Sequence, residues 1–597
     1  MAQQGVIDHN VDLDTRASRG GPASRLEAIV PLSITVVAGL LCYGLFLRRA
    51  VWLSVVGYSV SPAERVLGGE IPYRDFLYNY TPGTLWINAL LMKALGTSLL
   101  SVNLGILAFK LATLVSLFWI ARKLTNGWIA LAPVGLTLAW LGHKYVYGVV
   151  PTQYSLVFVL AATSMMLGYD RRRHLRWLLL SGLAAGIVFV FKYNVGILLM
   201  GAGTAVLFIR DVVVGAPNSS WRQRLFVCVK HAAAYWVGFG IVMSALAAFM
   251  AYNHALGPML SHFLHHAAEY SEARAVPLPG PRQLVAVALG VIIALFGGWL
   301  VILKTPRLFL AYLMAILILG CGLLLVPGRA YRIKLSVQAG VAYLPLILFA
   351  ASAALVVWRL RSCLRDDEAR REWWGQHGTL IVVGLFTIGA YLEMYPRADD
   401  YHLVRVLPLV FLLLTLFVVT TFRSVAGRFH KYLERPNGAA LLCVATPFIL
   451  LAAVGLEATW RPQFDSEFRF IDRNPLSIDR ARGMLVSARQ ADLIEGMARA
   501  IEENSGPGDS MFSFAQRGSG FYFLSARRNP TRFVWWRSVG IDTHDREEVV
   551  RMIGAREVTL VLLQDTLTNK SIREVVESNY HKVAAVADIA VFRRNDS

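Results

Sequence analysis

One stretch of the chain reads LVRVLPLVFLLLTLFVVTTF, at residues 403–422, and carries a single charge, Arg405, among aliphatic and aromatic side chains. An α-helix of this length can cross the ~30 Å hydrocarbon core of a membrane. The whole chain is similarly apolar, because 56% of its 597 residues are hydrophobic and only 16% are charged. Such a composition excludes an ordinary soluble protein and indicates a polytopic α-helical membrane protein.

Apolar segments of spanning length recur through the first three quarters of the chain. We predict about thirteen membrane helices, at residues 28–48, 99–121, 127–142, 152–169, 176–192, 194–210, 234–254, 283–303, 308–326, 335–357, 378–394, 403–422 and 439–457. Together they make a transmembrane domain at residues 28–457. Residues 83–96 are too short to span comfortably, so we expect a juxtamembrane helix there, within a first outer loop at residues 49–98.

The net charge of +20 reflects Lys and Arg dispersed in short clusters between the apolar segments. With an N-terminal tail of residues 1–27 in the cytoplasm, these clusters fall on the cytoplasmic side, as the positive-inside rule requires; they lie at 122–123, 170–173, 222–224, 304–307, 358–375 and 423–435. The dispersal argues against a nucleic-acid partner. The same topology predicts that the C-terminus lies outside.

After residue 457 the composition becomes that of a soluble domain. We expect a C-terminal α/β domain at residues 458–597. Its predicted elements are a helix at Met484–Glu503, strands at 510–514, 558–564 and 583–592, and helices near 546–553 and 570–579.

A polar island, GGEIPYRDFLYNYTPG at Gly68–Gly83, follows the first span. Charges beside the hydrocarbon boundary are costly unless they face a water-filled cavity. On the predicted topology, polar residues from the outer ends of several spans converge on the same face as this island. The predicted cavity residues are Tyr73, Arg74, Asp75, Tyr78, Lys144, Gln153, Lys192, Asn194, Arg397, His402 and Arg405.

A carboxylate beside basic residues suits transfer of a group from a phosphate-linked donor. The carboxylate can accept a proton from an attacking hydroxyl, while Arg and Lys stabilise the charge that grows on the departing phosphate. Two structural alternatives stay open. Asp75 and Arg74 would then be a solvated surface pair, and Lys192 a side chain that snorkels to the interface.

The segment HFLHHAAE places His262, His265, His266 and Glu269 at spacings that share one helical face. A metal site is one interpretation of this spacing. The sequence identifies no matching distant ligand, and interfacial histidines are common, so we assign no metal ligand. No cofactor is assigned, and a requirement for a divalent metal ion stays open.

Four motifs carry a resemblance to a known family. They are AERVLGGEIPYRDF at Ala63–Phe76, FKYNVG at Phe191–Gly196, YPRADDYHL at Tyr395–Leu403 and FYFLSARRNPTRF at Phe521–Phe533. In their order along the chain, they resemble polyprenyl-phosphate-sugar-dependent glycosyltransferases of the GT-C superfamily. The branch is that of the bacterial relatives of protein O-mannosyltransferases and of the lipid A aminoarabinose transferase.

The resemblance implies a multi-pass protein of the bacterial inner (plasma) membrane whose cavity opens to the periplasm. It implies an inverting transfer of a sugar from a polyprenyl-phosphate donor to an envelope glycan, lipid or protein, among membrane lipids. Carried over, Asp75 is the candidate base, and the residues around the lipid phosphate are Lys192, Arg397, His402 and Arg405. Relatives often carry an acid just after the first span, where this chain reads VVGYSVSPAE. Either Asp75 or Glu64 must therefore serve, or the enzyme is impaired.

The competing hypothesis is a non-catalytic envelope protein or a lipid-linked-glycan transporter built on the same scaffold. A transporter would favour charges near the middle of spans and symmetric halves with broken helices. In this sequence the charges gather at the ends of spans and no repeated halves are evident. We therefore favour the enzyme.

Overall fold

The computed structural model describes residues 22–49, 51–140, 148, 150–264, 311–312, 315, 343–361, 363, 366–394, 400–428, 438–456, 474–515, 517–534, 536, 543–564 and 570–595. Within these residues, five helices are long and apolar enough to cross a membrane: Leu99–Leu124, Tyr193–Val214, Trp221–Tyr252, Asp367–Met394 and His402–Thr421. A multi-pass membrane protein is therefore confirmed. The predicted spans at 283–303 and 308–326 fall almost entirely outside the described residues, so the number thirteen stays a prediction.

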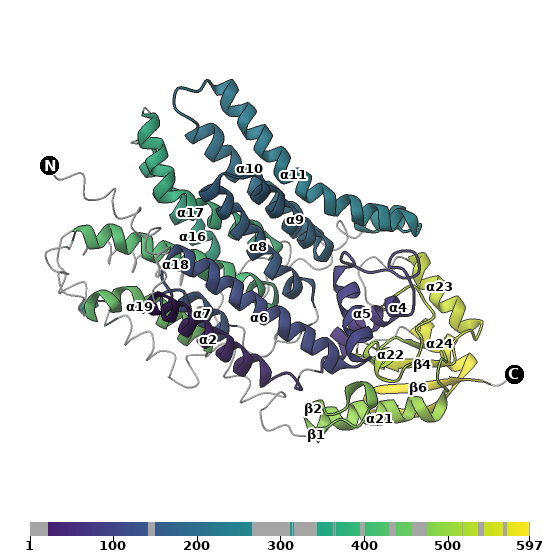
Figure 1. Ribbon diagram of the computed structural model, residues 1–597. Helices are drawn as coiled ribbons and strands as arrows, with labels where there is room; N and C mark the ends of the chain where they lie inside the picture. The colour runs from purple at the N-terminus through teal and green to yellow at the C-terminus, as the bar shows by residue number, and fades with distance from the viewer. Residues whose placement is uncertain are drawn as a thin grey trace.

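The apolar segments form a bundle of helices (Figure 1). Its helices are α2 (Pro22–Gly44), α6 (Leu99–Leu124), α7 (Leu131–Trp140), α8 (Pro151–Arg172), α9 (Leu175–Phe191), α10 (Tyr193–Phe208), α11 (Trp221–Tyr252), α16 (Leu344–Arg361), α17 (Asp367–Tyr391), α18 (Asp400–Arg428) and α19 (Gly438–Gly455). A helix satisfies every backbone group within its own segment, which a lipid environment demands. The helices α11 and α17 begin well before the predicted spans, in the charged segments that precede the apolar residues.

Glycines bring α9 and α11 into close contact. A Cβ atom added at Gly182 of α9 would lie 1.9 Å from the carbonyl oxygen of Tyr235, and one added at Gly238 of α11 would lie 2.0 Å from that of Leu179. Small residues at such crossings allow the backbones to approach closely, which is how helices associate where lipid removes the hydrophobic driving force. Larger residues would separate this pair.

The bundle has two polar ends. Thr152 at the start of α8, Lys192 between α9 and α10, and Glu393 after α17 meet at one end. At the other end, Arg210 after α10 pairs with Asp170 near the end of α8. The second end collects the segments predicted to be cytoplasmic, and the first collects those predicted to be outside.

The first outer loop is largely helical. It contains α3 (Leu53–Val55), a π-helical segment at Val56–Val60, α4 (Ser61–Leu67) and α5 (Gly83–Leu95). The helix expected at residues 83–96 is therefore confirmed as a helix. Between α4 and α5 lies the polar island, which holds the candidate base.

The C-terminal region forms the expected α/β structure. A four-stranded sheet has the order β3-β4-β6-β5, in which β3 runs parallel to β4 and the other pairs are antiparallel. Its strands are β3 (Met511–Ser513), β4 (Leu560–Gln564), β5 (Tyr580–Val586) and β6 (Ile589–Arg594), and a small second sheet pairs β1 (Asn474–Pro475) with β2 (Leu485–Val486). The helices are α21 (Ala488–Asn504), α22 (Gly520–Leu524), α23 (Thr543–Gly554) and α24 (Lys570–Asn579). Figure 1 shows this region beside α4 and α5, at one end of the bundle.

Two predictions in this region were wrong in detail. The strand expected at 583–592 is instead part of a hairpin, because the chain turns at Ala587, whose φ is +51°, between β5 and β6. The helix expected from Met484 starts at Ala488, because Leu485 and Val486 pair with β1 and the Ser487 side chain caps the helix.

Candidate functional site

Asp75 is held by its own loop. Its carboxylate accepts a hydrogen bond of 2.7 Å from the backbone N–H of Ile71, and two of 2.8 Å each from Nε and Nη2 of Arg74. The pKa of this carboxyl lies below its ordinary value, mainly because the Arg74 guanidinium hydrogen-bonds to it. The lowered pKa keeps the Asp75 carboxylate ionised. Because 29% of the side chain is exposed, a hydroxyl group can reach it.

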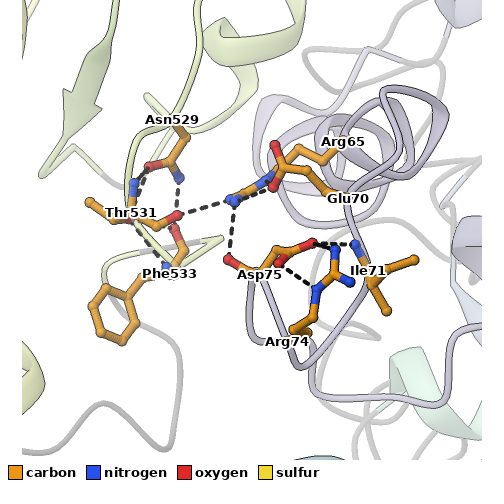
Figure 2. Close-up of polar contacts among 8 residues, drawn as sticks. All are labelled: Arg65, Glu70, Ile71, Arg74, Asp75, Asn529, Thr531 and Phe533. Atoms are coloured by element: carbon orange, nitrogen blue, oxygen red, sulfur yellow. Dashed lines mark hydrogen bonds and ion pairs between the residues drawn. The ribbon is translucent and has the colours of Figure 1, made fainter. Parts of the chain in front are cut away.

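Arg65 ties this loop to the C-terminal region, as Figure 2 shows. Its Nε donates to the Glu70 carboxylate at 2.7 Å, its Nη1 to the carbonyl oxygen of Thr531 at 2.9 Å, and its Nη2 to that of Asp75 at 3.3 Å. The Asn529 side chain organises the accepting turn by receiving the Thr531 N–H at 3.0 Å. One guanidinium thus connects the Asp75 backbone to the C-terminal region.

Glu64 also faces the C-terminal region. The Arg480 guanidinium holds it with two nitrogens, Nη1 at 2.8 Å from Oε2 and Nη2 at 2.6 Å from Oε1. Burial raises the pKa of Glu64, and the contact with Arg480 offsets part of this effect. Both candidate acids are engaged at two points by an arginine and are similarly exposed, at 30% for Glu64 and 29% for Asp75. They differ in their partners, because Arg74 is the neighbour of Asp75 in the chain, whereas Arg480 connects Glu64 to the C-terminal region and so suits an anchor.

Tyrosines connect the loop to the bundle. Tyr73 is buried with a φ of +70°, and its hydroxyl donates to the carbonyl oxygen of Tyr80. The rings of Tyr58, Tyr78 and Tyr80 lie within 5.6 to 6.1 Å of one another. The positive φ is uncommon for a residue with a large side chain, so tertiary packing must hold Tyr73 in place.

The loop ends against α9. Thr81 donates a 2.7 Å hydrogen bond to the carbonyl oxygen of Phe189, and a Cβ atom added at Gly83 would lie only 2.7 Å from that of Val190. Two residues further on, α9 ends at Lys192, whose backbone is extended. The Lys192 Nζ lies 5.8 Å from the centre of the Tyr80 ring. The aromatic part of the island therefore borders Lys192.

Lys192 forms a buried ion pair with Glu393. Its Nζ contacts Glu393 Oε1, and Thr152 donates a 2.6 Å hydrogen bond to the same oxygen. The Lys192 side chain is 5% exposed and that of Glu393 is 1% exposed, so both charges are removed from water. The sequence analysis overlooked Glu393, although a lone acid within a predicted span is itself a signal of function.

Arg405 approaches this pair, and Lys110 in turn lies near Arg405. Arg405 of α18 lies close enough to interact electrostatically with both Lys192 and Glu393, and with Lys110 of α6. Lys110 is buried, with its Nζ 4.9 Å from the centre of the Tyr43 ring, and has no acidic partner among the described residues. Since Lys110 lies in the interior of α6, the expectation that charges gather only at span ends does not hold at this position.

The structure thus brings some of the predicted residues together and not others. Lys192 and Arg405 share one cluster, and buried His402 lies one helical turn before Arg405. Half-buried Gln153 and Asn194 adjoin Thr152 and Lys192 along the chain. The ionic and hydrogen-bond partners of the Asp75 carboxylate belong to its own loop, and the aromatic bridge through Tyr73 and Tyr80 links that loop to the cationic cluster. Arg397, Lys144, His265, His266 and Glu269 lie outside the described residues.

Comparison with protein families matches residues 79–226 to the model described as dolichyl-phosphate-mannose-protein mannosyltransferase. The resemblance to this branch of the GT-C glycosyltransferases, predicted from the sequence, is confirmed by this match. The matched segment begins one residue before Tyr80 and includes Lys110, Thr152 and Lys192. Comparison with curated proteins finds no match.

Solved structures similar to this chain include three at 12% sequence identity. ArnT from Cupriavidus metallidurans bound to undecaprenyl phosphate covers 94% of this chain and 97% of its own, with a TM-score of 0.49. The apo form of that protein has the same coverage and a TM-score of 0.48. The Archaeoglobus fulgidus oligosaccharyltransferase complex with Zn and sulfate covers 89% of this chain and 68% of its own, with a TM-score of 0.44.

Proposed function

We propose that this chain is a membrane glycosyltransferase that moves a sugar from a polyprenyl-phosphate donor to a cell-envelope acceptor, which is a glycan, a lipid or a protein. The observation that carries the proposal is the convergence of Lys192 and Arg405 around Glu393, within and beside the segment that matches a mannosyltransferase family. Buried Lys110, in the same matched segment, lies within electrostatic reach of Arg405. Buried cations are expensive in a membrane and mark sites that handle charge. A lipid-linked phosphate supplies the complementary charge.

In this proposal the cationic cluster binds the donor phosphate. Lys192 and Arg405 contact its oxygens, and Arg397 and His402 complete the site. Glu393 keeps Lys192 in position through their ion pair, while Thr152 fixes the carboxylate. As the bond to the sugar breaks, negative charge grows on the phosphate oxygen, and positively charged groups already in place stabilise that charge.

Asp75 is the proposed base, with Glu64 as the alternative. The acceptor hydroxyl attacks the anomeric carbon, its proton passes to the carboxylate, and the bond between that carbon and the phosphate oxygen breaks. The electron pair of this bond leaves with the polyprenyl phosphate, and the sugar configuration inverts. The lowered pKa of Asp75 keeps it ionised, and the contact of Glu64 with Arg480 of the C-terminal region suits an anchor; both favour Asp75 as the base.

The proposal also includes an orientation. The donor site and the C-terminal domain lie on the periplasmic side of a bacterial inner membrane, and the N-terminal tail lies in the cytoplasm. The arrangement of the bundle supports this, because the basic segments around Arg173 and Arg224 share the end opposite Lys192.

A deletion strain tests the function. Mass spectrometry of lipid-linked sugars and envelope glycans should show an accumulated polyprenyl-phosphate sugar and a product that lacks one sugar. These two changes together would name the donor and the acceptor. Unchanged pools of both would contradict the proposal, provided that the parent strain expresses the chain.

Lys110 gives the competing hypothesis, a lipid-linked-glycan transporter, one specific observation in its favour, because a charge within a span is typical of a translocation pathway. Reconstituted vesicles separate the two functions. An enzyme cleaves a polyprenyl-phosphate sugar when an acceptor is present on its side, whereas a transporter moves the intact donor between leaflets. Movement without cleavage would replace the leading proposal.

A further inference from the structure

At the end of the bundle opposite the first outer loop, a cavity of about 470 Å³ is lined by four arginines but only one acidic residue. The arginines are Arg173, Arg210, Arg224 and Arg371. Arg173 follows α8, Arg210 lies in the segment after α10, Arg224 is in the first turn of α11 and Arg371 is near the start of α17. Figure 1 shows the α10–α11 connection at the far end of the bundle from the C-terminal region. The proposed sugar transfer does not use this cavity.

The floor of the cavity is fixed by hydrogen bonds. A π-helical segment at Ile209–Val214 continues α10 and contributes Arg210 and Asp211. Arg210 Nη1 donates to the Tyr169 hydroxyl at 2.7 Å, and Asp211 Oδ2 lies 2.7 Å from Nδ1 of His231. Local π-helical turns are frequent at functional sites. The floor is therefore rigid and its charges are largely satisfied.

The rim is different, because its cations remain accessible. The Arg173 side chain is 53% exposed and lies 3.6 Å from Asp170. Arg371 is exposed and makes no hydrogen bond or ion pair with any described residue. Arginine forks match phosphate oxygens in pairs, so Arg371 can take up a phosphate group without breaking an existing bond. Arg173 and Arg224 pair with Asp170 and Asp367 at 3.6 and 3.5 Å and would share their charge with the phosphate.

An apolar helix face adjoins the cavity. Val227 of α11 lines it, and on the same part of α11 Trp221, Phe226 and Val229 are 66%, 71% and 58% exposed. The helix is long and apolar enough to cross a membrane, so hydrocarbon chains can lie along this face. A ligand with an anionic head and hydrocarbon chains fits the cavity and the helix face together.

We propose that this cavity binds the phosphate headgroup of an anionic phospholipid, whose acyl chains lie along the exposed face of α11. Basic pockets between membrane helices on the cytoplasmic side suit such headgroups. The site stands apart from Lys192 and Asp75, so it does not depend on the sugar-transfer proposal. It would anchor the α10–α11 connection and the start of α17 to the same lipid.

The test titrates the purified full-length chain in detergent with phosphatidylglycerol and with phosphatidylcholine of the same acyl chains, and native mass spectrometry counts the bound lipid. We expect phosphatidylglycerol to bind preferentially, and Arg371→Gln to weaken it about fivefold, which corresponds to ~1 kcal/mol for one basic residue near a lipid surface. Arg173→Gln should weaken it by a similar factor. The matched control is Arg222→Gln, since Arg222 is exposed at the start of α11 but does not line the cavity.

Three results would overturn the proposal. The first is equal binding of the two lipids, and the second is an equal loss in the Arg371 and Arg222 variants. The third concerns a small anion. If inorganic phosphate raises the thermal midpoint as much as phosphatidylglycerol does, and Arg371→Gln removes both effects, the cavity binds a soluble anion instead of a lipid.

Discussion

Lys192→Met would separate the structural role of the buried ion pair from its role in binding. The substitution keeps the volume of the side chain and leaves the Glu393 carboxylate, whose side chain is 1% exposed, without its contacting cation. Breaking a buried pair costs about 3 to 5 kcal/mol. We expect about 3 kcal/mol, the lower end of that range, because Arg405 stays within electrostatic reach of the carboxylate.

Glu393→Gln should destabilise by a similar amount, because it leaves the ammonium group buried. The double variant Lys192→Met with Glu393→Gln removes both charges, so its stability should return to within about 1 kcal/mol of the wild type. The assay is the thermal midpoint of the purified chain in detergent, followed by tryptophan fluorescence. If the double variant is as unstable as the sum of the single variants, the two residues are not coupled as the structure indicates.

The affinity of these variants for polyprenyl phosphate distinguishes them further. A hydrogen bond to a charged group contributes about 1.5 to 3 kcal/mol, so loss of Lys192 should weaken polyprenyl phosphate binding about tenfold to a hundredfold. The stable double variant should show this full loss. Glu393→Gln should bind more weakly than the wild type but more tightly than Lys192→Met, because Lys192 keeps its charge and loses the partner that positions it. Wild-type affinity in the double variant would refute the assignment of Lys192 to the phosphate.

Three further outcomes follow from the first outer loop. Asp75→Asn should lower the turnover rate about 10²-fold or more. Arg74→Ala should move the acidic limb of the pH–rate profile to higher pH, because Arg74 lowers the pKa of Asp75 and the carboxylate acts as a base only when it is ionised. An unmoved limb would exclude Asp75 as that base. A double-mutant cycle on Glu64 and Arg480 should give a coupling of about 1 kcal/mol in thermal unfolding, and zero coupling would contradict the two-point ion pair. Gly520→Ala should make the C-terminal region more susceptible to limited proteolysis, because the added Cβ would lie 2.5 Å from the carbonyl oxygen of Leu53. Gly375→Ala is the control, since its Cβ meets nothing within 4 Å. Equal protection of both variants would contradict the contact between Gly520 and Leu53.

Much of the fold could be predicted from the sequence, because each apolar segment carries its own signal. The run around Arg405 is long enough to identify α18 without any tertiary information. A hairpin turn is harder to predict where the chain lacks the glycine or asparagine that usually marks it. Ala587 adopts a positive φ in a hairpin that has neither glycine nor asparagine, so the two strands resembled one.

The site was less predictable, because its contacts join residues that are far apart in the chain. Thr152 and Glu393 are separated by 241 positions, and no spacing pattern links them. Glu64 and Arg480 are separated by 416, so the role of Glu64 as an anchor emerged only from the structure. Lone charges within spans, such as Lys110 and Glu393, were the signal that the sequence did offer.

The release of polyprenyl phosphate from a polyprenyl-phosphate sugar by the purified full-length chain, with envelope extract as the source of acceptor, tests glycosyl transfer most directly. We predict turnover by the wild type, and a loss of about 10²-fold or more in Asp75→Asn with an unchanged thermal midpoint. A wild-type chain that binds the donor and leaves it intact, or an Asp75→Asn variant with full turnover, would contradict the proposed reaction.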